Sequence, residues 1–114
     1  MKHTIKTEGN AVSVKLAGFL GAGPDLDEVR ASIKRELDAG ARNFVIDLKE
    51  VKAINSTGLG VLVALYTAVT SKNGEMVLTN VSKPVLSTMR VVRLDQVFRI
   101  ADEGEAGPES RNES

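Results

Sequence analysis

Residues 44–62 read FVIDLKEVKAINSTGLGVL and combine, in order, an expected strand, a connection and the beginning of a helix. The strand prediction rests on the continuous apolar run at residues 44–48, which is typical of a strand covered on both faces. Residues 49–54 are then predicted to connect this strand to a helix that runs from Thr57 to about Ser71. Strand, connection and helix in this order indicate an α/β sheet.

Further strands and helices are expected on both sides of this stretch. The other strands are expected at residues 4–8, 11–16, 75–79 and 97–100. The other helices are expected from Pro24 to a cap at Gly40 and from Ser82 to Val92, with a loop at residues 18–23 before the first. Strands that alternate with helices over short connections favour a largely parallel sheet. We therefore expect one α/β domain, with a mixed sheet of four to five strands packed against three to four helices.

The composition excludes several kinds of chemistry. The length of 114 residues allows one domain, and the absence of cysteine rules out disulfides, thiolate metal sites and a cysteine nucleophile. The single histidine, His3, excludes a multi-histidine metal site and is a poor catalytic base so close to the chain end. No apolar run is long enough to span a membrane, and no signal peptide is visible. We expect no metal, no cofactor and a cytoplasmic location.

The charges balance over the whole chain but not along it. Fifteen basic residues equal fifteen acidic ones, whereas residues 101–114 carry five acids against one arginine. That segment has no large apolar side chain, which predicts a disordered acidic tail after a domain at residues 1–100. The domain carries a net charge of +4 and its basic residues are scattered, so we expect no nucleic-acid partner.

The side chains with the most chemical content are Asn55, Ser56 and Thr57, at the predicted start of the second long helix. Ligands of open α/β sheets bind beyond the carboxyl ends of strands, and this is such a position. A phosphate on Ser56 would lie at the positive end of the helix dipole and would add a charge of about −1.5 to −2. The same residue types are preferred helix caps, so the residues alone favour a plain cap.

Two glycines and a loop close by leave alternatives open. Gly58 and Gly60 fall in the first helical turn, although glycine costs up to about 1 kcal/mol relative to alanine in a helix. Their missing side chains either leave room for a partner or allow the helix to pack closely on the sheet. In the loop, Phe19 and Leu20 either form an apolar contact patch or fold into the core.

The run DLKEVKAINSTGLGVLVAL at residues 47–65 resembles the signature of STAS domains, the fold of sulfate transporters and anti-sigma factor antagonists. The resemblance extends over roughly residues 4–100 and is strongest to free-standing bacterial anti-sigma factor antagonists. In that family the serine that matches Ser56 is phosphorylated by a serine kinase that is also the anti-sigma factor. The unphosphorylated form binds this kinase and frees the sigma factor, and a serine phosphatase resets the cycle.

The resemblance implies a non-enzymatic regulatory module that is phosphorylated on Ser56, with Thr57 as the second candidate. The kinase partner would hold the ATP and Mg²⁺, because this chain has no phosphate-binding loop of its own. Weak association into a homodimer is left open. The expected partner-binding residues come from the loop and the helix start: Phe19, Leu20, Gly21, Asn55, Ser56, Thr57, Gly58, Leu59 and Gly60.

Two positions differ from the usual family pattern. Asn55 stands where the family has aspartate, and residues 18–23 lack the two acids that the family carries there. Both differences favour an alternative in which the chain is a constitutively unphosphorylated STAS scaffold or a regulatory subunit of a transport complex. A small enzyme that uses Ser56 or Asp47 is a further alternative. The shortage of histidine and the absence of cysteine argue against it.

Overall fold

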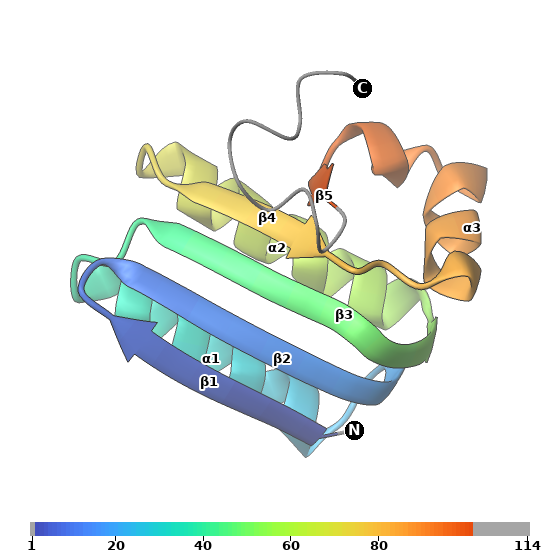
Figure 1. Cartoon of the computed structure of the whole chain (residues 1–114), viewed down its shortest axis with the longest axis horizontal. Helices are drawn as coiled ribbons and strands as arrows, with labels where there is room; N and C mark the ends of the chain where they lie inside the picture. Colours follow the sequence, from blue (N-terminus) through green and yellow to red (C-terminus); the bar gives the residue numbers. More distant parts are fainter. Residues whose placement is uncertain (1, 102–114) are drawn as a thin grey trace.

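The computed structural model describes residues 2–101, which form a five-stranded sheet, three α-helices and one short 3-10 helix (Figure 1). The elements are, in chain order, β1 (Lys2–Glu8), β2 (Ala11–Leu20), α1 (Pro24–Asp38), β3 (Asn43–Ile54), α2 (Ser56–Ser71), β4 (Glu75–Thr79), α3 (Lys83–Val91), the 3-10 helix η1 (Leu94–Gln96) and β5 (Arg99–Ala101). The predicted α/β fold with a mixed sheet is confirmed.

The strands lie side by side in the order in which they occur in the chain. β1 runs antiparallel to β2, and the tight turn between them uses Gly9 in a left-handed conformation with φ of 62°. β2, β3, β4 and β5 are parallel neighbours. A helix connects each parallel pair, since parallel strands can be joined only by a crossover.

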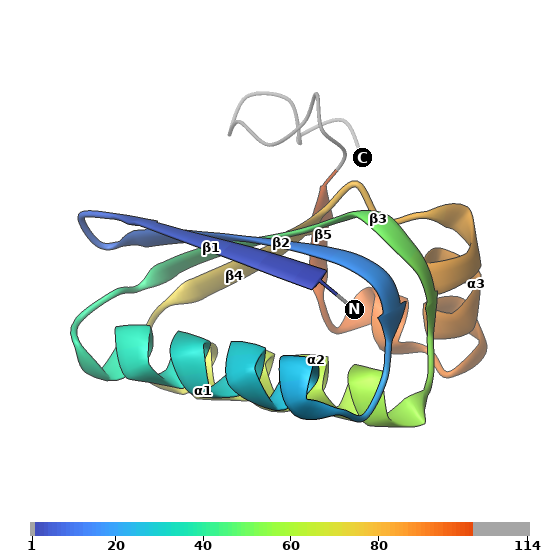
Figure 2. The ribbon, with the colours of Figure 1, turned by 90° about the horizontal axis from the view of Figure 1, so that it is seen from below.

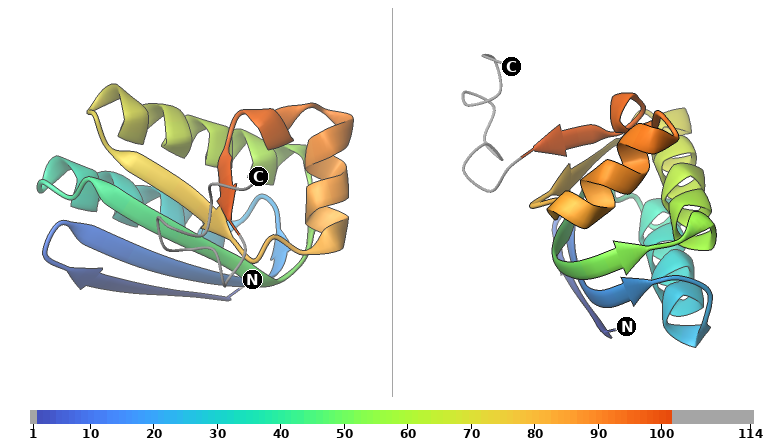
Figure 3. Two further views of the ribbon diagram at one scale, coloured as in Figure 1. Left: turned by 45° about the horizontal axis from the view of Figure 1, so that its top comes forward. Right: turned by 90° about the vertical axis from the view of Figure 1, so that its right-hand side faces the viewer.

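The two long helices pack on one face of the sheet (Figure 2). α3 lies instead at the end of the sheet where β3 finishes (Figure 3). Just before α3, the hydroxyl of Ser82 donates a hydrogen bond to the carbonyl oxygen of Val51 at 2.8 Å. The core between sheet and helices is built from side chains that repeat every second residue on strands and every three to four on helices. Its central members are Val12, Val14, Leu16, Leu26, Val29, Ile33, Leu37, Phe44, Ile46, Leu48, Leu62, Leu65 and Val69.

β3 differs from its prediction in length and in cover. It continues to Ile54, so the expectation that residues 49–54 form a connection is wrong. The residues beyond Leu48 pair with β2, whose register shifts between Lys15 and Ala17 and again between Gly18 and Phe19. The strand is also not covered on both faces. Val45 is 38% exposed, because both long helices pack on the opposite face.

Two predicted boundaries also move. The loop expected at residues 18–23 starts later, because β2 continues to Leu20. Ala101, expected as the first residue of a disordered tail, is the last residue of β5 and is buried. The remainder of that predicted tail, residues 102–114, lies outside the described residues.

Candidate functional site

The candidate site lies where β3 ends and α2 begins. Asn55 is the residue between them, and its extended backbone lets its side chain turn back onto the helix. Its Oδ1 accepts a hydrogen bond from the backbone N–H of Gly58 at 2.9 Å. Asn55 is therefore the N-cap of α2, and the interpretation of Ser56 as a plain cap is wrong.

Ser56 and Thr57 are the first two residues of α2, and both are exposed. Within residues 2–101, neither hydroxyl forms a hydrogen bond to another protein group. The backbone N–H groups in the first turn of a helix have no helical acceptor and carry the positive end of the dipole. The structure thus holds two free hydroxyls on the surface, at a position that favours negative charge.

The loop after β2 lies directly against this helix start. The backbone N–H of Asn55 donates to the carbonyl oxygen of Leu20 at 3.2 Å. Gly21 is wedged between two side chains, since a Cβ there would lie 2.5 Å from the ring of Phe19 and 2.8 Å from Nδ2 of Asn55. The fold thus joins the two segments that sequence analysis assigned to one contact surface.

Gly58 and Gly60 differ in why they lack a side chain: one allows close packing of the helix, and the other leaves open space. A Cβ on Gly58 would lie 2.3 Å from the carbonyl oxygen of Leu20, so this glycine lets α2 pack closely on β2. A Cβ on Gly60 would have no neighbour within 4 Å, and the residue is exposed. Close packing explains Gly58, whereas Gly60 borders open space.

Burial divides the nine expected partner-binding residues. Leu20 is 0% exposed and Leu59 is 6% exposed, and Gly21 and Gly58 are also buried. These four residues fill the contact between the loop, β2 and α2, so the surface that is open to a partner consists of the other five. The exposed members are Phe19, Asn55, Ser56, Thr57 and Gly60, which we call the Ser56 surface.

Phe19 is the large apolar residue of this surface. It is 53% exposed, so the alternative in which it folds into the core is wrong, while the same alternative holds for Leu20. A cavity of about 260 Å³ lies beside Phe19 and is lined by the loop and the first turn of α1, including Ala22, Pro24 and Asp25. Sequence reasoning missed these three residues. The Gly21-Ala22-Gly23-Pro24 run was the available signal, because it fixes a turn at the entrance to a helix.

The enzyme alternative gains no support from this site. The described residues contain no group of three or more histidine, cysteine, aspartate or glutamate side chains able to hold a metal ion. Asp47, the other residue of the enzyme alternative, lines a separate pocket on the sheet, and its Oδ1 accepts from the backbone N–H of Lys49 and from Nδ2 of Asn80. None of the helices in residues 2–101 combines the length and the hydropathy that crossing a membrane requires.

Comparison with known families agrees with the fold. Residues 22–106 match the model of the STAS domain. The match covers well over half of the chain, so the chain belongs to the STAS domain family.

One relative and three solved structures are similar to this chain. The anti-sigma-B factor antagonist of Bacillus subtilis (strain 168) is 28% identical over 107 residues, which are 90% of this chain and 93% of the relative. A Thermotoga maritima protein has a similar structure, with a TM-score of 0.77 at 22% identity over 96% of this chain and 94% of that chain.

The second structure is that of the anti-sigma factor antagonist SpoIIAA. Its unphosphorylated form has a TM-score of 0.73 at 18% identity, over 89% of this chain and 88% of that chain. The phosphorylated form of the Bacillus protein has a TM-score of 0.72 at 16% identity, over 90% of this chain and 94% of that chain. At these identities the two comparisons demonstrate a shared fold.

Proposed function

We propose that this chain is an anti-sigma factor antagonist that binds a serine-kinase anti-sigma factor through the Ser56 surface. In the unphosphorylated state it occupies the kinase and releases a sigma factor, and phosphorylation of Ser56 ends the binding. Membership of the STAS family and the 28% identity to an anti-sigma-B factor antagonist support this proposal.

The observation that carries the proposal is the free hydroxyl of Ser56. It is exposed at the start of α2, and the capping of the helix is performed by Asn55. A phosphate on this oxygen would be tolerated by the helix, whose dipole favours negative charge at its N-terminus. It would also add about −1.5 to −2 charges to a surface whose residues carry none, which a partner shaped for the neutral surface would not accept.

The chemistry of phosphorylation belongs to the partners in this proposal. The kinase holds ATP and Mg²⁺, a serine phosphatase removes the phosphate, and the chain itself acts by binding and not as an enzyme. These steps occur in the cytoplasm, where sigma factors meet RNA polymerase.

A second candidate function is a STAS scaffold or transport-complex subunit that is never phosphorylated. Two observations favour it: Asn55 is neutral, and the loop residues 18–23 carry no acid. A kinase that recognises negative charge next to its target serine would find none at either position.

One binding experiment tests the proposal against this alternative. The purified, unphosphorylated chain is mixed with each serine-kinase anti-sigma factor of its native host, first with ADP and then with ATP and Mg²⁺. We expect one kinase to bind in ADP and, in ATP, to place a single phosphate on Ser56 and release the chain, as measured by fragment mass spectrometry. Binding without phosphorylation would favour the scaffold, and absence of binding to every kinase would contradict the antagonist function.

Replacing Phe19 with alanine should weaken the complex by tenfold or more. Exposed aromatic side chains beside a cavity are typical anchors of protein interfaces, and their loss costs about 2 kcal/mol or more. Val91→Ala is the matched control, since Val91 is 83% exposed at the end of α3 and outside the Ser56 surface. The measurement is the dissociation constant by calorimetry. Equal losses in both variants would contradict an interface centred on the Ser56 surface.

A further inference from the structure

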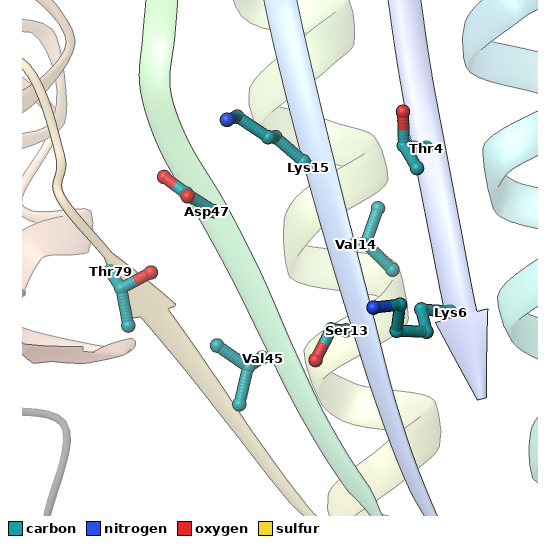
Figure 4. A pocket seen from close by; sticks show the side chains of 8 residues that line it. All are labelled: Thr4, Lys6, Ser13, Val14, Lys15, Val45, Asp47 and Thr79. Atoms are coloured by element: carbon teal, nitrogen blue, oxygen red, sulfur yellow. The ribbon is translucent and has the colours of Figure 1, made fainter. Parts of the chain in front are cut away.

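A second pocket lies on the face of the sheet that α1 and α2 leave free. It has a volume of about 350 Å³ and is lined by side chains from β1, β2, β3 and β4 (Figure 4). Within residues 2–101 no helix covers this face (Figure 2). Pockets that hold small molecules begin at about 300 Å³, so the volume suits a small metabolite.

The strand register brings the polar groups of the pocket together. Thr4, Lys15, Asp47 and Thr79 are successive partners across the four strands and therefore share one row. In the next row Lys6 pairs with Ser13, and Ser13 pairs with Val45. Side chains of paired residues in adjacent strands point to the same face of a sheet, so both rows face the pocket.

Two positive charges in this pocket have no protein partner. Lys6 extends from β1 toward β2, and Lys15 extends from β2 toward β3 (Figure 4). Among the described residues neither ammonium group forms an ion pair or a hydrogen bond, although Lys15 is the strand neighbour of Asp47. Two unpaired lysines at one pocket attract an anion, and phosphate is the anion that lysine commonly binds.

The pocket also offers hydrogen-bond acceptors. Oδ1 of Asp47 is occupied by Lys49 N at 2.9 Å and Asn80 Nδ2 at 3.2 Å, whereas the described residues give Oδ2 no donor. Thr79 is 5% exposed, and its Oγ1 reaches the carbonyl oxygen of Ile46 only at 3.5 Å. A carboxylate oxygen and a buried hydroxyl with a long hydrogen bond are suited to the hydroxyl groups of a ligand.

We propose that this pocket binds a small phosphate ester that also carries free hydroxyl groups, of the sugar phosphate type. Lys6 and Lys15 pair with the phosphate. Asp47 Oδ2 and Thr79 Oγ1 accept hydrogen bonds from the hydroxyls, and Val45 provides an apolar floor. The pocket lies on the face opposite α2, so the proposal is independent of the function of Ser56.

An NMR titration of the full chain with ribose 5-phosphate tests the proposal, with ribose and inorganic phosphate as separate probes. We expect saturable shifts of amide signals confined to the strands around Val45, and tighter binding of ribose 5-phosphate than of either probe. Equal binding of ribose 5-phosphate and inorganic phosphate would overturn the proposal, because the hydroxyl contacts would then contribute nothing. Absence of saturable shifts at millimolar ligand would overturn it as well.

Three variants identify the groups responsible. Lys15→Gln should weaken ribose 5-phosphate binding about tenfold, which is the value of one charge-assisted hydrogen bond. Asp47→Asn should weaken ribose 5-phosphate while leaving inorganic phosphate unchanged or tighter, because it removes an acceptor and a repelling charge together. Lys72→Gln, at an exposed lysine after α2, is the matched control and should have no effect. Equal losses in Lys15→Gln and Lys72→Gln would show nonspecific attraction of the phosphate to surface lysines and would overturn the proposed site.

Discussion

Gly58→Ala is expected to lower the free energy of unfolding by about 2 kcal/mol, whereas Gly60→Ala is expected to raise it by up to about 1 kcal/mol. The two glycines lie in the same helical turn, so the opposite signs come from what surrounds them. A methyl group on Gly58 would meet the main-chain carbonyl oxygen of Leu20 at 2.3 Å, and the main chain of β2 cannot move aside without disturbing its pairing. A methyl group on Gly60 would meet nothing within 4 Å, and only the helix preference for alanine remains.

Urea unfolding of the two variants beside the parent chain measures this difference. The slope of unfolding free energy against urea should stay constant, which shows that the same surface is exposed in all three proteins. A stabilised Gly58→Ala variant would mean that α2 does not sit on β2 as closely as described. A Gly60→Ala variant destabilised as strongly as Gly58→Ala would mean that Gly60 is also a packing residue.

Ser56→Asp is expected to weaken binding of the kinase partner at least tenfold, while Ser56→Ala should bind within about threefold of the parent chain. A fixed charge in the contact surface must be desolvated when the partner binds, and an unpaired buried charge costs several kcal/mol. The alanine variant loses no intramolecular hydrogen bond, because the described structure gives the Ser56 hydroxyl no partner. Calorimetric titration of the kinase with each variant provides the measurement.

Controls separate this effect from unfolding and from net charge. An aspartate at the start of α2 interacts favourably with the helix dipole, so Ser56→Asp should not reduce stability. Thr67→Asp adds the same charge at an exposed position in the second half of the same helix and should bind normally. If Ser56→Asp and Ser56→Ala bind equally well, charge at Ser56 does not control the interaction and the scaffold candidate is favoured.

Much of the fold was predictable because hydrophobic periodicity follows from which face of an element is buried. Val12, Val14 and Leu16 alternate along β2, and Leu26, Val29 and Ile33 follow the helical period on α1. This local signal needs no knowledge of distant contacts. It located each strand and α-helix near its observed position, but not the 3-10 helix η1.

The errors arise where pairing between strands decides the outcome. Beyond Leu48, the buried residues of β3 are Val51 and Ile54, three residues apart, which is neither a strand period nor a long helical pattern. The irregular pairing with β2 produces this spacing, and register shifts of that kind are not encoded in one segment alone. The largely apolar run at residues 44–48 also led to the wrong expectation of cover on both faces, because only the packing of the helices shows that a single face is covered.

The sequence predicted where the candidate site lies, but it did not predict which of its side chains are exposed. The order of residues 54–60 indicated a helix starting after a central strand, and this location agrees with the structure. Which of Phe19 and Leu20 is exposed depends on how β2 twists after its register shift at Gly18 and Phe19. The sequence alone does not distinguish these two apolar neighbours. The cavity beside Phe19 depends in the same way on how α1 enters, because its lining comes from two elements.

The rigid start of α2 determines how a phosphate on Ser56 would act on a partner. The first turn of α2 has little freedom to move, because it is held by the main-chain contact at Gly58, the Asn55 cap and the close contacts of Gly21. A group added to Ser56 would therefore cause little rearrangement of the backbone. The partner would then respond to the added charge at Ser56 and not to a change in the conformation of the domain. Under the proposed function, a phosphate on Ser56 would be added and removed repeatedly without any part of the domain having to refold.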